Sequence, residues 1–186
     1  DHFISVSSYK TPSKIKKLKY IYSTISNYAK DANKDIKDLR ILEVACGNGS
    51  IALPLTTLGC HVTAFDIDAE AVEFLQAQAK QNNIENLVVT VDNGYTFDDG
   101  QSYDLVIASE VFHHLLEPLR FAANIAVRMH EGSLLIATIP NGYGPYELGR
   151  RINPFLYLKK WNFLLRLVGK RDYVHGSGAD RCQFFS

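Results

Sequence analysis

The sequence predicts an α/β fold with one doubly wound parallel sheet. From Leu39 onward, short apolar runs alternate with segments that have the helical period of apolar residues. These runs are apolar throughout instead of alternating with polar residues, which is typical of parallel strands covered on both faces. Right-handed crossovers between five such strands predict the order 3-2-1-4-5, with ligands bound at the carboxyl ends of the strands.

Residues 1–37 are predicted to form an N-terminal helical segment. The helix is expected from residue 13 to about 30, with Pro12 near its start and Thr11 or Ser13 as its cap. Helical spacing relates the apolar residues Ile15, Leu18, Ile21, Tyr22 and Ile25. Five lysines and no acid occupy residues 10–19, so the segment is locally basic.

Residues 38–141 are predicted to form the core of the domain. The strands are expected over 39–45, 61–66, 86–92, 103–110 and 133–140. The helices between them are expected over 50–59, 69–83 and 117–132, with Gly59 and Gly132 at two of the helix ends. This order places the loops that follow all five strands on one rim of the sheet.

Residues 142–186 are predicted to form a loop on the substrate side, a basic helix over 154–171 and a tail. Seven Lys or Arg and no acid lie between Arg150 and Arg171, beside an apolar stripe. Three interpretations remain open for this helix. It packs on the domain with a solvated basic face, it caps a substrate site, or it contacts an anionic lipid surface.

The composition indicates one cytoplasmic domain over 1–186. The formal net charge is zero, which gives no general attraction to nucleic acid. Three cysteines without paired spacing are typical of reduced thiols, and no apolar run approaches the length of a membrane span. No metal site is predicted.

The stretch "ILEVACGNGS" follows the first strand and predicts a ligand-binding loop. Gly47 and Gly49 allow the backbone to approach a ligand closely. Asp66 comes at the tip of the second strand, where a carboxylate accepts hydrogen bonds from a ribose diol. The pair predicts a ligand that contains adenosine.

Two adenosine ligands fit the loop, a dinucleotide and S-adenosylmethionine. The letters "GNGSIA" satisfy a dinucleotide pattern, and an NAD-dependent oxidoreductase is kept as an alternative. Glu43, however, would repel a pyrophosphate and attract the ammonium and sulfonium of S-adenosylmethionine. Asp92, at the third strand tip, can accept from an adenine amino group. The acids at three strand tips favour the sulfonium ligand.

The stretches "ILEVACGNG", "HVTAFDID", "VTVDNG", "YDLVIASEVFHHLLEP" and "GSLLIATIPN" together resemble the class I S-adenosylmethionine-dependent methyltransferases. They are most similar to the branch that includes the ubiquinone-biosynthesis methyltransferases. The resemblance covers roughly Leu39 to Asn141. It implies a Rossmann-like fold and methyl transfer to an oxygen, nitrogen or carbon of a small molecule, with S-adenosylhomocysteine as the product. A domain that binds the cofactor without catalysis is the alternative.

The resemblance implies that two groups of residues hold the methionine half of the cofactor. Glu43, Ala45, Gly47 and Gly49 would line the methionine side, and Ser109 and Glu110 would lie near the sulfonium and the ammonium. Ala45 departs from the family pattern, which has the first glycine of the loop there. Alanine is small, so we expect a narrower loop that is still open.

The adenosine half is assigned in the same way. Asp66 would bind the ribose hydroxyls, and Ile67 would pack on the adenine. Asp92 would face the adenine amino group, with the backbone of Asn93 beside it.

The resemblance implies an in-line methyl transfer in which the protein mainly holds the reactants together, with a base needed for a hydroxyl acceptor. Candidate catalytic residues are His113, His114 and Tyr143. Among the histidines, we expect His113 to be exposed and His114 to be buried or at a helix start. The acceptor is expected to be lipid-like or anionic.

Class I relatives usually continue past strand five into a sixth and a seventh strand. About 46 residues follow strand five here, and they lack a clear match to that hairpin. We therefore expect the C-terminal strand hairpin to be absent and strand five to be an edge that is exposed or covered by a partner. A homo-oligomer and a weak membrane-surface contact through 154–171 are left open.

Overall fold

The computed structural model describes residues 11–140. Of these, the residues through Thr138 belong to one compact unit. In chain order its elements are α2 (Pro12–Asp31), η1 (Ile36–Asp38), β1 (Arg40–Val44), α3 (Ala52–Thr56), β2 (His61–Asp66), α4 (Ala69–Gln81), β3 (Leu87–Val91), β4 (Tyr103–Ser109), η2 (Phe112–His114), α5 (Pro118–Ala126) and β5 (Met129–Thr138).

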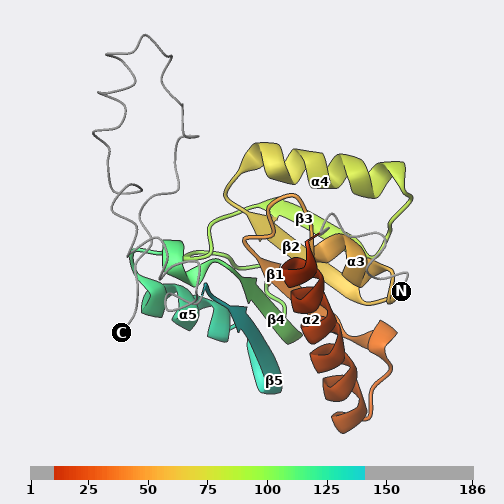
Figure 1. The fold of residues 1–186 in the computed structure, drawn as a ribbon. Coiled ribbons are helices and arrows are strands. Elements are labelled where there is room, and N and C mark those ends of the chain that lie inside the picture. Colours follow the sequence, from red (N-terminus) through yellow and green to blue (C-terminus); the bar gives the residue numbers. More distant parts are fainter. Residues whose placement is uncertain (1–10, 141–186) are drawn as a thin grey trace, which may run out of the picture. The chain divides into compact units, whose positions relative to one another are not determined.

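The sheet confirms the predicted topology. Its order is β3-β2-β1-β4-β5, and every neighbouring pair is parallel. The order reverses at β1, which pairs with β2 on one side and β4 on the other (Figure 1). Within residues 11–140, β3 and β5 are the two edges of the sheet. A ligand in such a fold binds at the carboxyl ends of the strands, beside this reversal.

Helices cover both faces of the sheet because side chains alternate along each strand. On one face, Ile41 of β1 and Ile107 of β4 belong to a cluster that also takes in buried residues of α2, α3 and α4. On the other face, Leu42 and Val106 pack in a second cluster with Phe121 of α5. Figure 1 shows α2 and α5 as separate layers against the central strands.

Helix α2 follows the predicted pattern closely. Thr11 occupies the N-cap position without a side-chain hydrogen bond, and Pro12 lies in the first turn. Residues at helical spacing turn into the core, and four of them are buried: Leu18, Ile21, Ile25 and Ala29. Tyr22 lies at the margin of this face and is exposed.

The boundary between the last helix and strand five was predicted wrongly. Helix α5 ends at Ala126 instead of Gly132, and β5 begins at Met129 instead of residue 133. Met129 pairs with Tyr103 at the start of β4, and the register then jumps so that Leu134 pairs with Leu105. Pairing with β4 overrides the helical pattern of this segment, and the extra residues form an irregularity in β5.

The first core helix is also shorter than predicted. Residues 50–59 were expected to be helical, but α3 spans only Ala52–Thr56. Pro54 lies within its first turn, where the missing N–H costs little. Gly59 has φ +86° and closes the turn that leads into β2.

The predicted basic helix over 154–171, Tyr143 and the tail lie outside the described residues. The prediction of one domain over 1–186 therefore stays a prediction. Between residues 11 and 140, each helix is too short or too polar to cross a membrane.

Candidate functional site

The loops after the five strands meet at one rim, as the topology requires. The strands end at Val44, Asp66, Val91, Ser109 and Thr138. Four residues at the carboxyl ends of β1 and β4 have a left-handed backbone: Ala45, Gly47, Gly49 and Glu110. Such conformations cost free energy in non-glycine residues and gather at ligand-binding sites.

The loop after β1 turns sharply through left-handed residues. Gly47 has φ +52° and Gly49 has φ +77°. A Cβ on Gly47 would meet no atom within 4 Å, so open space lies beside its backbone. A Cβ on Gly49 would come within 2.3 Å of Leu75 Cδ1. Ala45 has φ +54°, so alanine accepts a conformation that favours the family's glycine.

Asp66 joins this loop to the end of β2. Its Oδ2 accepts a hydrogen bond from the backbone N–H of Gly47 at 2.7 Å, and its Oδ1 accepts one from Asp68 N–H at 3.0 Å. Asp68 caps the N-terminus of α4, and its Oδ1 accepts hydrogen bonds from the N–H groups of Glu70 and Ala71. Each oxygen of Asp66 retains a second lone pair, so the carboxylate can still accept from a ligand's hydroxyls.

Glu43 is buried behind the glycine loop. Only 3% of its surface is exposed, and its Oε2 has no hydrogen-bond partner. The pKa of its carboxyl is raised from 4.5 to about 8, mainly by burial and also by the charge of Asp66. The backbone N–H of Ala52 and the ammonium of Lys17 act in the opposite direction. A buried carboxyl with an unpartnered oxygen is costly unless it is protonated or meets a cation.

The third strand tip supplies a second carboxylate and an apolar platform. Asp92 N–H donates to the carbonyl of Asp66 at 3.0 Å, and Asn93 N–H donates to Asp92 Oδ1 at 2.6 Å. Two apolar side chains beside these acids are exposed at the rim, Ile67 (74%) and Val91 (52%). An adenine ring needs such a platform with polar groups at its edge.

A lysine from α2 completes the rim, and it was not among the residues predicted from the sequence. Lys17 Nζ donates to Ser109 Oγ at 3.1 Å and to Glu110 Oε1 at 3.4 Å. Thr138, at the end of β5, also donates to Glu110 Oε1, at 3.1 Å. The lysine run at residues 10–19 was the available signal. It did not show which lysine reaches the loop after β4, because that depends on how α2 packs.

The exposure expected for the two histidines was wrong. His113 is 9% exposed and its Nδ1 has no hydrogen-bond partner, whereas His114 is exposed. Both lie in the short η2 turn with ring centroids 3.9 Å apart. Burial lowers the pKa of His113, the charge of His114 lowers it further, and Glu110 opposes this. The turn points His113 inward because Phe112–His114 forms one 3₁₀ turn, which the sequence did not reveal.

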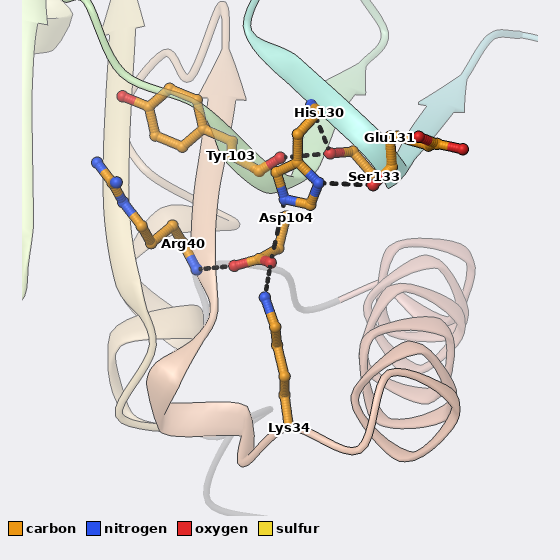
Figure 2. Close-up of polar contacts among 7 residues, drawn as sticks. All are labelled: Lys34, Arg40, Tyr103, Asp104, His130, Glu131 and Ser133. Atoms are coloured by element: carbon orange, nitrogen blue, oxygen red, sulfur yellow. Dashed lines mark hydrogen bonds and ion pairs between the residues drawn. The ribbon is translucent and has the colours of Figure 1, made fainter.

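A second polar cluster lies at the opposite end of the strands from the rim, where β1 and β4 begin (Figure 2). Asp104 is buried, and its two oxygens accept from Lys34 Nζ at 2.5 Å and from the Arg40 N–H at 2.9 Å. His130 Nε2 lies 3.3 Å from Asp104 Oδ1. Although burial alone would raise it, the pKa of Asp104 is lowered by these hydrogen bonds and by the charge of Lys34. We assign this cluster to stability because it lies at the amino ends of the strands.

The rim therefore carries buried and half-buried carboxyls, a glycine-containing loop and an apolar platform. This arrangement suits a nucleoside ligand with a positive charge. A family model described as a methyltransferase domain matches residues 42–137, just over half of the 186 residues. The chain belongs to this family of class I S-adenosylmethionine-dependent methyltransferases.

A curated relative indicates the nearer part of the family. The ubiquinone biosynthesis O-methyltransferase of Rickettsia bellii (strain OSU 85-389) is 35% identical over 136 residues, which are 72% of this chain and 54% of the relative. This chain thus spans about half the length of the curated relatives that it matches.

Solved structures confirm the fold. Coclaurine N-methyltransferase, bound to N-methylheliamine and SAH, has a TM-score of 0.54 and 19% identity, over 70% of this chain and 38% of that protein. The CcbJ methyltransferase of Streptomyces caelestis has a TM-score of 0.55 and 22% identity, over 62% of this chain and 46% of that protein. At these identities the likeness concerns the fold alone.

Proposed function

We propose that the protein transfers the methyl group of S-adenosylmethionine to an oxygen of a small-molecule acceptor. The observation that carries the proposal is the rim, where an unpartnered oxygen of buried Glu43 lies behind a glycine loop held by Asp66. A dinucleotide would bring a pyrophosphate to this carboxyl, whereas S-adenosylmethionine brings positive charge. The name of the Rickettsia bellii relative, an O-methyltransferase, supports oxygen as the attacked atom.

The residues present fit this cofactor. Glu43 and the loop from Ala45 to Gly49 would take the methionine half, with Ser109 and Glu110 near its positive groups. Lys17 would bind the cofactor's carboxylate, since its ammonium contacts Ser109 and Glu110 at this part of the rim.

The adenosine half would lie against the next two strand tips. Asp66 would bind the ribose hydroxyls, Asp92 and Asn93 would take the adenine edge, and Ile67 would take its face. The cofactor supplies a methyl group activated by positively charged sulfur, so these residues act by orientation and charge.

His114 is the proposed base for a hydroxyl acceptor. It is the exposed member of the histidine pair, so an acceptor from solution can reach it. His113 packs behind it, and its lowered pKa keeps that ring neutral near pH 7. A neutral neighbour leaves His114 free to accept the hydroxyl proton as the methyl group is transferred. Tyr143 remains a candidate outside the described residues.

The finer setting of the reaction is also proposed. The acceptor is lipid-like or anionic, the location is the cytoplasm, and the basic segment 154–171 contacts the acceptor or a membrane surface. A homo-oligomer is compatible with this setting. The local positive charge of that segment supports the proposed contact with an anionic acceptor or membrane surface.

Transfer of a labelled methyl group tests the proposal. The protein would be incubated with S-adenosylmethionine labelled at its methyl group and with phenol, amine and activated-carbon acceptors. We expect label on phenolic oxygen and a loss of roughly 10²-fold or more in kcat for His114→Ala. His61→Ala, at an exposed histidine that begins β2, is the control and should leave kcat unchanged. Cofactor binding without transfer to any acceptor class would instead indicate a non-catalytic domain.

A further inference from the structure

The side chain of Asn124, on helix α5, binds the loop from Asp92 to Phe97, which follows β3. Asn124 Nδ2 donates to the carbonyl of Gly94 at 3.1 Å and to the carbonyl of Phe97, also at 3.1 Å. A side-chain amide has two N–H donors, so this group satisfies two loop carbonyls at once. No other side chain in residues 11–140 bonds both ends of this turn through one atom.

Packing reinforces this attachment. Gly94 is buried against the ring of Phe121, and a Cβ there would come within 2.0 Å of that ring. The Tyr95 ring meets Phe121 edge to face at 5.8 Å. Because the fit is this close, a shift of α5 leaves the loop little room to keep its position.

The same loop presents the groups expected at the adenine. The N–H groups of Thr96 and Phe97 both donate to the carbonyl of Asn93 at 2.8 Å. Asn93 in turn donates its N–H to Asp92 Oδ1. The hydrogen bonds of the turn therefore run from the carbonyls that Asn124 holds to the carboxylate and peptide at the rim.

We propose that Asn124 is a positioning residue for adenine recognition. It fixes the loop from Asp92 to Phe97 on α5 and so sets where the carboxylate of Asp92 and the backbone of Asn93 meet the adenine. Asn124 itself does not touch the cofactor. This inference rests on the proposed cofactor site and names a residue that acts on it through the loop. If the loop is displaced, recognition of the adenine is weakened even though the residues that contact the adenine are unchanged.

The chain provides a matched control for this role. Asn86 Nδ2 donates to the carbonyls of Thr56 at 3.0 Å and Cys60 at 2.7 Å. It makes the same pair of bonds at the opposite end of β3, away from the rim. Phe121 is a poorer choice of variant, because its ring also meets Phe112 beside the histidine pair.

The test compares Asn124→Asp with Asn86→Asp by calorimetric titration, with the melting temperature of each variant measured alongside. The ligands are S-adenosylhomocysteine and S-inosylhomocysteine, which has an oxygen in place of the adenine amino group. We expect Asn124→Asp to weaken S-adenosylhomocysteine about tenfold and to reduce the preference for adenine over hypoxanthine. Asn86→Asp should keep the affinity within about twofold at a similar loss of melting temperature.

The outcomes separate this inference from the proposed function. Equal effects of the two variants on affinity, or no effect of Asn124→Asp, would overturn the positioning role. If Asn124→Asp does not fold, Asn124→Ala, measured at low temperature, is held to the same criterion. Failure of the unaltered protein to bind S-adenosylhomocysteine would overturn the cofactor site and this inference together.

Discussion

Gly47 donates its backbone N–H to Oδ2 of Asp66 at 2.7 Å, which ties the loop after β1 to the tip of β2. The second oxygen of Asp66 accepts from Asp68 at 3.0 Å. One carboxylate at the end of β2 thus holds the glycine loop that follows the neighbouring strand, β1. The group proposed to bind the ribose is also the group that shapes the methionine side of the site.

Replacing Asp66 should affect stability and binding together. Asp66→Ala leaves the backbone N–H groups of Gly47 and Asp68 without their acceptor. We therefore expect the free energy of unfolding to fall by about 1–3 kcal/mol. We also expect S-adenosylhomocysteine to bind on the order of 100-fold more weakly, because a charged acceptor for two hydroxyls is lost. Denaturant unfolding and calorimetry measure the two effects. Asp68→Ala, which removes only the cap of α4, should reduce stability and leave affinity unchanged.

Ala45→Gly should stabilise the protein. Ala45 has φ +54°, where an L side chain is strained and glycine is not. The relief exceeds the extra chain entropy of glycine, so we expect a gain of about 0.5–1 kcal/mol in the free energy of unfolding. Gly47→Ala is the reverse change at φ +52° and should destabilise. A loss of stability in Ala45→Gly would contradict this account of the loop.

Glu43 should make stability depend on pH. Burial raises its pKa to about 8 in the folded protein from 4.5, so between these values the folded state holds more protons than the unfolded state. The contribution of Glu43 is fully present below pH 4.5, and it is lost as pH rises toward about 8. The free energy of unfolding should therefore fall across this window. Glu43→Gln should flatten that part of the profile, as denaturant unfolding at several pH values would measure.

The same carboxyl links cofactor binding to proton release. Positive charge beside Glu43 favours its ionised form, so S-adenosylmethionine should bind more tightly as pH rises toward about 8. Calorimetry in buffers of different ionisation enthalpy counts the protons that are released. No proton release in the unaltered protein, or equal release from Glu43→Gln, would argue against this linkage.

Lys17→Met should weaken S-adenosylmethionine and S-adenosylhomocysteine alike. Both ligands carry the same carboxylate, and we place the Lys17 ammonium beside it. We expect each Kd to rise roughly tenfold, and this rise to shrink at high salt. Lys19→Met removes an exposed lysine from the same helix and is the control. Equal effects of the two variants would mean that Lys17 acts only through general charge.

Asp104 should matter for stability alone. Its oxygens accept from Lys34 and from the backbone N–H of Arg40 at the amino edge of the sheet. Asp104→Asn should lower the free energy of unfolding by about 2–3 kcal/mol, because a neutral amide replaces the buried carboxylate and Lys34 loses its charged partner. Cofactor affinity, measured well below the melting temperature, should stay unchanged. A large loss of affinity would mean that this edge is coupled to the rim.

The sheet and the acids at its rim could be predicted from the sequence because both follow from local patterns. Buried parallel strands are apolar throughout, and right-handed crossovers leave few orders for them. Asp66 and Asp92 could be placed because Asp66 ends such a strand and Asp92 directly follows one. The spacing of Gly47 and Gly49 directly after β1 likewise predicted the position of the glycine loop.

The remaining features depend on packing that a local pattern does not contain. Lys17 contacts Glu110, which lies 93 positions later in the sequence. The run of lysines could not show which of them makes this contact. The burial of His113 depends on the 3₁₀ turn, and the early end of α5 depends on pairing between Met129 and Tyr103. Each case is a tertiary contact that overrides or selects among local choices.

The most direct test of the central claim is a calorimetric titration of the protein with S-adenosylmethionine, S-adenosylhomocysteine and NAD in parallel, repeated with Asp66→Ala. We expect both adenosyl-sulfur ligands to bind, the Asp66→Ala variant to lose most of that affinity, and NAD to give no heat of binding. Binding of NAD alone would contradict the assignment of the rim to a positively charged cofactor.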